Sequence, residues 1–178
     1  MPERGFTHET PNEGATNVWL TPPEIIARLG KFDLDPCAAP EPRPWPTATQ
    51  HIALPDDGLT AKWDGRVWCN PPYGPHVGAW MHKMTVHRQG TALIFARTET
   101  AAWQNEIWPN ATAILFMRGR IRFHRPDGRI GDSASAPSAL IAFGVGDAIL
   151  LATSGIAGKL IYPQQGSMMR LVTPEPPK

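Results

Sequence analysis

The sequence predicts an α/β protein with a mostly parallel, twisted sheet and helices flanking it. Two observations predict this fold. First, residues 67–69, 77–84 and 91–96 form a strand, a helix and a strand in succession, because two apolar runs enclose a segment of helical spacing. Second, a helix at 101–108 and a strand at 112–117 repeat this alternation, which favours parallel strands joined by helical crossovers.

Length and composition are those of one globular domain. The chain has 178 residues, which is enough for one substantial core and short for two. Its 20 prolines and 16 glycines indicate many loops and short elements. We predict a flexible N-terminal segment over residues 1–16, a single domain over 17–163 and a proline-containing C-terminal tail over 164–178.

Charge and cysteine content narrow the function classes. The formal net charge of +1 gives no global field for a polyanion, so a nucleic-acid contact has to come from a local basic patch. Cys37 and Cys69 do not form a CxxC pair and the histidines lack metal-ligand spacing, so we expect no metal. Neither an apolar leader nor a run of about 18 apolar residues is present, which predicts a cytoplasmic protein without a membrane contact.

The first predicted helix follows Thr21. Thr21, two prolines and Glu24 fit a capping box, in which Thr21 is the N-cap and Glu24 reaches back toward it. Ile25 and Leu29 lie on one face of this helix, which therefore packs on a core, and Gly30 ends it.

A short strand is predicted over residues 32–36, with Asp35 at its end. In open α/β sheets ligands bind at the carboxyl ends of the strands, so Asp35 is placed to be functional. Residues 37–55 contain five prolines and are predicted to form a loop. The Asp-Asp-Gly sequence at 56–58 then indicates a turn before the strand at 67–69.

The second half of the chain contains further strand signals. We predict strands at 121–123, 139–143 and 148–151, separated by turns at 127–128 and 146–147. Several large apolar side chains recur at helical spacing and are expected to pack in the core; they are Trp80, Met81, Met84, Trp103 and Trp108.

The turn after residue 69 is the most informative stretch of the chain. Pro71 and Pro72 stiffen it and remove two backbone hydrogen-bond donors, so its carbonyl groups are free to accept from a ligand. Asn70 adds a side-chain oxygen that accepts a second bond, and Tyr73 offers a flat aromatic face. These groups suit a planar ring that carries an exocyclic amino group.

Four segments in sequence order resemble the amino-group DNA methyltransferases, most closely the small phage-type DNA N6-adenine methyltransferases. They are Trp19-Leu-Thr-Pro22, Asp35-Pro-Cys-Ala38, Asp57-Gly-Leu59 and Asn70-Pro-Pro-Tyr73, with further likeness at Gly119-Arg-Ile-Arg-Phe123 and Ala136-Pro-Ser-Ala-Leu140. The resemblance covers roughly residues 17–145. It implies a Rossmann-like S-adenosylmethionine-dependent methyltransferase fold with a C-terminal antiparallel strand. The implied reaction moves a methyl group from S-adenosylmethionine to adenine N6 in DNA, with site-specific or weak sequence preference.

The resemblance also implies roles for the residues of the central turn. Asn70 and the backbone carbonyl of Pro71 accept hydrogen bonds from the adenine amino group, and Pro72 keeps the turn rigid. Tyr73 stacks on the base once it has left the duplex, because the amino group of a paired base is not reachable.

For the cofactor, the resemblance implies a second set of residues. Asp35, beside Pro36, pairs with the amino group of the methionine moiety, and Trp19 and Thr21 border the same moiety. Asp57 accepts a hydrogen bond from the adenine amino group of the cofactor, with Asp56 as the competing candidate. One departure concerns Pro40-Glu41-Pro42, which stands where larger methyltransferases have a Gly-x-Gly loop. The ribose partner is therefore unidentified, with Glu41 as a candidate.

The local basic patch is predicted around residues 118–129. Arg118, Arg120 and Arg122 alternate, which would place three guanidinium groups on one face of a strand, at a spacing suited to a phosphate backbone. Arg125, Arg129 and His124 extend the patch. Sequence readout is expected to be short or weak and to come from loops within residues 124–137.

Alternative interpretations remain for most of these residues. Thr21 can be explained as a helix cap without a ligand, and residues 56–58 as a surface turn. The arginines can be explained as a solvated surface of the protein. Two other functions stay open. One is a methyltransferase that acts on RNA or on a protein glutamine. The other is a non-catalytic DNA-binding remnant of the same fold, which the absent glycine loop suggests.

Overall fold

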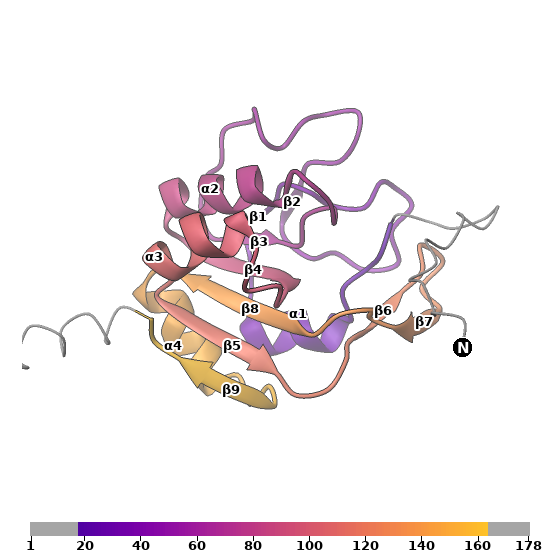
Figure 1. The fold of residues 1–178 in the computed structure, drawn as a ribbon. Helices are drawn as coiled ribbons and strands as arrows, with labels where there is room; N and C mark the ends of the chain where they lie inside the picture. The colour runs from indigo at the N-terminus through magenta and orange to yellow at the C-terminus, as the bar shows by residue number, and fades with distance from the viewer. Residues whose placement is uncertain (1–17, 164–178) are drawn as a thin grey trace, which may run out of the picture.

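The structure is a computed structural model that describes residues 18–163. The predicted N-terminal segment 1–16 and the predicted tail 164–178 lie outside the described residues. Within the described range the strands form a seven-stranded sheet, in the order β2-β1-β3-β4-β8-β5-β9, and a two-stranded ribbon of β6 and β7 (Figure 1).

The elements are short, as the proline and glycine content predicts. The strands are β1 (Leu34–Asp35), β2 (Gln50–His51), β3 (Val67–Cys69), β4 (Gly90–Phe95), β5 (Ala113–Met117), β6 (Arg122–His124), β7 (Ile130–Ser133), β8 (Ser138–Phe143) and β9 (Gly158–Ile161). The helices are α1 (Pro23–Leu29), α2 (Val77–His87), the π-helix η1 (Ala102–Ile107), α3 (Trp108–Asn110) and α4 (Val145–Thr153).

The central sheet is parallel in one half and antiparallel in the other. Strands β2, β1, β3 and β4 pair in parallel. Strands β8, β5 and β9 continue the sheet with antiparallel pairings. The predicted strand–helix–strand unit is β3, α2 and β4, and it is confirmed. The next repeat is different, because β8 lies between β4 and β5, which run in the same direction without pairing.

The ribbon of β6 and β7 belongs to the connection from β5 to β8. Strands β5 and β8 are antiparallel neighbours, with Phe116 opposite Ala139. The end of β5 and the start of β8 therefore lie at the same edge of the sheet, and the ribbon between them leaves the sheet there. Strand β4 runs in the same direction as β5, and β3 is parallel to β4. Both β3 and β4 therefore end at this edge as well. Figure 1 shows the ribbon extending from that edge of the sheet.

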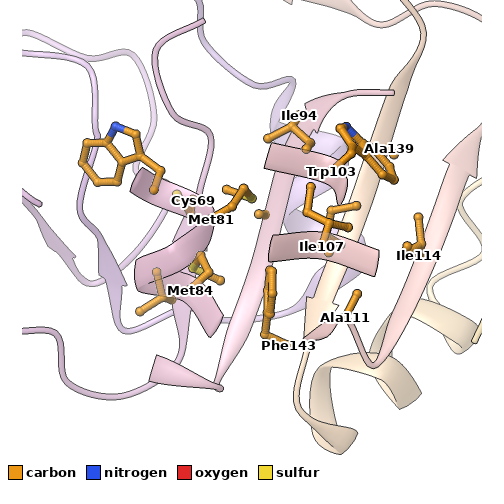
Figure 2. Close-up of a cluster of buried hydrophobic side chains, with 14 of the residues drawn as sticks. Cys69, Met81, Met84, Ile94, Trp103, Ile107, Ala111, Ile114, Ala139 and Phe143 are labelled. Carbon is orange, nitrogen blue, oxygen red and sulfur yellow. The ribbon is translucent and has the colours of Figure 1, made fainter. Parts of the chain in front are cut away.

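Two buried clusters lie on the two faces of the sheet. Alternation along β3 assigns the side chains, because Val67 and Cys69 belong to one cluster and Trp68 to the other. The first cluster packs α2 and η1 on the sheet, as Figure 2 shows; it includes Met81, Met84, Ile94, Trp103, Ile107, Ile114, Ala139 and Phe143. The second packs α1 and α4 on the opposite face; it includes Ile25, Leu29, Leu93, Leu115, Leu140, Ala148 and Leu151. Both faces of the sheet are therefore covered.

The predicted capping box at the start of α1 is wrong. Pro22 is the N-cap, and no side chain caps the helix. The backbone N–H of Ile25 donates to the carbonyl of Pro22 at 3.0 Å, so the first turn closes through the backbone. The hydroxyl of Thr21 is instead 3.2 Å from the side-chain nitrogen of Asn70, from which it accepts a hydrogen bond. A tertiary contact has replaced the local one.

The predicted strand at 148–151 is also wrong, because these residues lie in α4. Asp147, Ala148 and Leu151 are buried at helical spacing, whereas Ile149 and Leu150 are exposed. A short apolar run fits a strand or a helix equally well, and only packing against β8 and β5 decides between them. The turn predicted at 146–147 lies within the same helix, and β2, β7 and β9 were not predicted.

Candidate active site

The predicted site residues converge on the edge where the parallel strands end. Asp35 ends β1 and Asn70 follows β3, and these strands are neighbours. Phe95 ends β4, the next strand along the sheet. Parallel strands bring their carboxyl ends to one edge, so three segments far apart in sequence meet there.

A cavity of about 350 Å³, here called the turn cavity, opens beside Asn70–Tyr73. Its size is typical of small-molecule sites. Most of the residues predicted for the cofactor and for catalysis line it: Trp19, Pro36, Asp56, Asp57, Asn70, Pro71, Pro72 and Tyr73. A hollow of about 40 Å³ adjoins it and is lined by Thr21, Asp35, Trp19 and Asn70. The structure therefore brings together every predicted cofactor and catalytic residue.

Asn70 presents an unused acceptor. Its side-chain nitrogen donates to the hydroxyl of Thr21, and this contact fixes the orientation of the amide. Its oxygen Oδ1 is buried and has no hydrogen-bond partner among the described residues. A buried acceptor without a partner costs about 1–3 kcal/mol of folding free energy, so its retention points to a hydrogen-bond donor that arrives with a ligand.

Tyr73 is held by aromatic neighbours. Its ring lies parallel to that of Phe95, with centroids 4.0 Å apart and an interplanar angle of 5°. The ring of Phe123, from β6, meets it edge-on at 6.2 Å. Tyr73 nevertheless stays 37% exposed, so part of its ring is open to a ligand. Burial raises the pKa of its phenol, which therefore remains neutral at physiological pH.

Asp35 is a buried carboxyl group with two hydrogen-bond donors, and the guanidinium of Arg43, which lines the same hollow, is a nearby cation. The hydroxyl of Thr47 donates to its Oδ2. The backbone N–H of Cys37 donates to its Oδ1 at 3.1 Å. Burial raises the pKa of Asp35 to about 6, although these two bonds oppose the shift. A cationic group in the adjoining hollow would stabilise the carboxylate form.

The acidic turn that follows β2 is placed by backbone packing. A Cβ on Gly58 would lie 1.8 Å from the carbonyl oxygen of Pro36, so only glycine permits this approach. The carboxylate of Asp57 accepts from the backbone N–H of Leu59 at 2.9 Å. Asp56 is exposed and lines the turn cavity as well.

Several residues in and around the turn cavity were not predicted from the sequence. Lys83 of α2 does not line the cavity, but it donates to the carbonyls of Gly58, at 3.0 Å, and of Leu59, at 2.6 Å, and also to that of Ala61, so it holds the acidic turn. The lining residues that were missed are Val18, Cys37, Ala38, Ala39, Pro40, Ile52, Ala53, Leu54 and Trp80. Their position is the sequence feature that could have identified them, because most of them lie in the loops that follow β1 and β2. Glu41 is absent from this lining and pairs with Arg43 at 2.6 Å.

The arginine patch exists, but its predicted geometry is wrong. Only Arg122 lies in a strand, since Arg118 and Arg120 belong to the connection between β5 and β6. Arg118, Arg120, Arg122 and Arg125 are exposed, and no carboxylate pairs with them within residues 18–163. Arg129 is partly neutralised by Asp127, at 3.0 Å.

The ribbon that carries these arginines is tied to the site. The backbones of Leu20 and His124 exchange hydrogen bonds of 2.8 and 2.9 Å. The ring of Trp45 meets that of His124 edge-on at 5.0 Å. Phe123 reaches Tyr73. Exposed positive charge therefore adjoins the Asn-Pro-Pro-Tyr turn.

The remaining features carry no comparable chemistry. Cys37 and Cys69 are free, with sulfur atoms 3.9 Å apart, and burial raises the pKa of the Cys37 thiol, which disfavours the reactive thiolate. Residues 18–163 contain no group of three potential metal-ligating side chains. No helix in that range is both long enough and apolar enough to cross a membrane. A larger cavity, of about 620 Å³, lies beside α4 and touches no predicted site residue.

One family model matches most of the chain. The model of the family described as DNA N-6-adenine-methyltransferase (Dam) matches residues 8–144. No curated protein and no solved structure matches the chain. The matched range includes the acidic turn, the Asn-Pro-Pro-Tyr turn and the ribbon.

Proposed function

The chain belongs to the DNA N-6-adenine-methyltransferase family, and on this premise we propose that Asn70–Tyr73 hold the target adenine beside a methyl donor in the turn cavity. The family transfers a methyl group from S-adenosylmethionine to adenine N6 in DNA. The unpartnered, buried oxygen of Asn70 is the observation that carries the assignment of residues.

The chemistry follows from two hydrogen-bond acceptors in a rigid turn. The lone pair of an aromatic amine is delocalised into the ring, so adenine N6 is a poor nucleophile. Asn70 Oδ1 and the carbonyl of Pro71 would accept hydrogen bonds from the two amino hydrogens, hold these hydrogens out of the ring plane and so localise the lone pair on N6. As the bond from N6 to the methyl carbon forms, the bond from that carbon to sulfur would break and leave a neutral thioether, and N6 would lose its extra proton to solvent afterwards, so no general base is needed before attack. Fixed placement of two bound reactants can contribute roughly 7–11 kcal/mol to lowering the barrier.

The residues around the turn cavity fit S-adenosylmethionine. When bound, this cofactor supplies an electrophilic methyl group on a sulfonium centre. Asp35, beside Pro36, would bind the ammonium group of the methionine moiety, with Trp19 and Thr21 on its border. Asp57 already accepts from Leu59, whereas the carboxylate of Asp56 has no such bond among the described residues. Both line the cavity and remain the candidates for the adenosine moiety.

The sheet supports a Rossmann-like methyltransferase arrangement. Three of the four parallel strands, β2, β1 and β3, are followed directly by residues that line the turn cavity, and a reversed strand, β8, is inserted between β4 and β5. Helices cover both faces, as they do in doubly wound folds. The antiparallel pairing of β8 with β4 and β5 supports the C-terminal antiparallel strand that the resemblance implies.

Tyr73 and the ribbon supply the DNA side of the proposed site. The open part of the Tyr73 ring would stack on an adenine that has left the duplex, and Phe95 supports the ring from the other face. Arg118, Arg120, Arg122 and Arg125 would contact phosphates next to that base. Exposed loops within residues 124–137 would provide a short or weak sequence readout.

Product analysis tests the function directly. The protein is incubated with methyl-labelled S-adenosylmethionine and with DNA, RNA or protein, and the modified residue is identified by mass spectrometry. We expect N6-methyladenine in DNA alone. Label in RNA or in a glutamine side chain would reassign the substrate. No S-adenosylmethionine binding by the folded protein would favour the non-catalytic remnant.

Salt dependence tests the ribbon. Replacing Arg120 or Arg122 by glutamine is expected to weaken DNA binding at every sequence and to lower the slope of log affinity against log salt by about 1 for each phosphate that is no longer neutralised. Arg88 is the matched control, because it is exposed and lies just before the start of β4, at the end of the strands away from the site. An unchanged slope in both ribbon variants, measured by fluorescence anisotropy, would move the DNA contact away from the ribbon.

A further inference from the structure

A second cavity, of about 540 Å³, adjoins the Asn-Pro-Pro-Tyr turn. Tyr73 lines both this cavity and the turn cavity. The other walls come from the start of α2 and from the segment between β4 and η1, so we call it the α2–η1 cavity. Its lining includes Gly74, Gly78, Phe95, Arg97 and Trp103.

The lining combines an aromatic wall with one exposed cation. Tyr73 and Phe95 form the parallel stack described above, and the indole N–H of Trp103 donates to the carbonyl of Phe95 at 2.9 Å, which fixes that end of β4. The guanidinium of Arg97 lies 5.9 Å from the centroid of the Phe95 ring. Arg97 is exposed, and no carboxylate within residues 18–163 pairs with it. An aromatic surface beside a free guanidinium matches a base and its phosphate.

The target adenine itself does not belong in this cavity. Its amino group has to reach Asn70 Oδ1 and the Pro71 carbonyl, and neither residue lines the α2–η1 cavity. We propose that this cavity holds the nucleotide next to the target adenine, with its base on the Tyr73–Phe95 side and its phosphate at Arg97. The proposal rests on the assignment of Asn70–Tyr73 to the target base.

Part of the cavity wall is bare backbone, which makes a sharp test available. A Cβ built on Gly78 meets nothing within 4 Å, so a side chain there enters open space. Gly78 lies in α2, where glycine is about 0.5–1 kcal/mol less favourable than alanine. A larger residue at this position should therefore narrow the cavity without weakening the fold.

Gly78→Leu is expected to raise the dissociation constant for DNA about tenfold, with the midpoint of thermal unfolding unchanged or higher and the S-adenosylmethionine affinity unchanged. Gly146→Leu is the matched control. Gly146 is likewise the second residue of a helix, a Cβ there also meets nothing within 4 Å, and α4 follows the end of β8 at the opposite edge of the sheet. Both variants should be stable, and only the first should lose DNA affinity.

Arg97→Gln, with Arg88→Gln as its control, should weaken DNA binding and lower the salt slope by about 1. An oligonucleotide that the wild type methylates is then made with an abasic residue on either side of the target adenine. One of the two should weaken wild-type binding and abolish the effect of Gly78→Leu, which also identifies the side.

Wild-type DNA affinity in Gly78→Leu would overturn the proposal, as would an effect of Gly78→Leu that persists with both abasic substrates. The catalytic assignment fails by a different result, namely full turnover in Asn70→Ala. The two proposals are therefore refuted by different measurements.

Discussion

Replacing Asn70 by alanine is expected to lower kcat for adenine methylation by about 10²- to 10³-fold, the usual effect of removing one preorganised hydrogen-bonding group from a catalytic site. The variant loses the buried Oδ1, which has no other partner in the described part of the protein. The fold should remain intact, because the deleted oxygen makes no hydrogen bond within it and the one bond lost, from the Asn70 amide nitrogen to the hydroxyl of Thr21, contributes about 1 kcal/mol. Single-turnover kinetics with labelled methyl donor measure the loss, and calorimetric titration checks that the donor still binds.

Asn70→Asp is the matched control for this prediction. A carboxylate keeps an acceptor oxygen for the adenine amine, and the hydroxyl of Thr21 can turn to donate to it instead of accepting. We expect this variant to recover most of the turnover that alanine loses. Equal loss in both variants would show that Asn70 acts through its amide nitrogen and not through the acceptor.

Replacing Asp35 by asparagine is expected to stabilise the folded protein at pH 8 and to weaken S-adenosylmethionine binding by about tenfold to a hundredfold. The loss of affinity follows from removing one charge-assisted contact, worth about 1.5–3 kcal/mol. The gain in stability follows from burial, because the carboxylate of Asp35 is ionised at pH 8 although only 4% of the residue is exposed. The carboxylate that would bind the cofactor therefore lowers the stability of the folded protein.

The sign of the pH dependence follows from the raised pKa. Asp35 has a pKa of about 6 in the folded protein against 3.8 ordinarily, so the folded state binds more protons between these values and the free energy of unfolding falls as pH rises through them. The stabilisation by Asp35→Asn should therefore be near zero at pH 4 and reach about 2–3 kcal/mol above pH 6. Denaturant unfolding at several pH values measures it.

The same group makes cofactor affinity depend on pH. A bound ammonium group favours the carboxylate, so wild-type affinity should fall as pH drops below about 6, and this dependence should vanish in Asp35→Asn. Asp33→Asn is the control, because Asp33 is exposed and immediately precedes β1. A control variant that behaves like Asp35→Asn would show that net charge, and not the buried site, causes the effect.

The parts of the molecule that could be predicted are those with a local cause. Strand β3, helix α2 and strand β4 follow from apolar spacing, and the end of α1 follows from Gly30, whose φ is 84°. The predictions that failed concerned segments with two local solutions. Residues 148–151 suit a strand or a helix, and Thr21 suits a cap or a tertiary contact, so packing made the choice.

The ribbon shows a further limit of sequence patterns. Alternation of Arg118, Arg120 and Arg122 predicted one strand, whereas the chain leaves β5 at Met117 and resumes as β6 only at Arg122. The positive charge is present as predicted, but its position beside Tyr73 comes from Phe123 and His124. The sequence identifies the charged residues, whereas their position relative to Tyr73 depends on the tertiary structure.

The amino-acid sequence by itself determined the stiff Asn-Pro-Pro-Tyr turn, the order of the acidic segments and the membership in an adenine methyltransferase family, because proline geometry and residue order are local properties of a chain. Tertiary structure alone decided that Thr21 orients Asn70, that Phe95 supports Tyr73 and that Gly58 closes on Pro36. Each of these contacts joins segments far apart in sequence, and only the packing of both sheet faces brings such segments within reach.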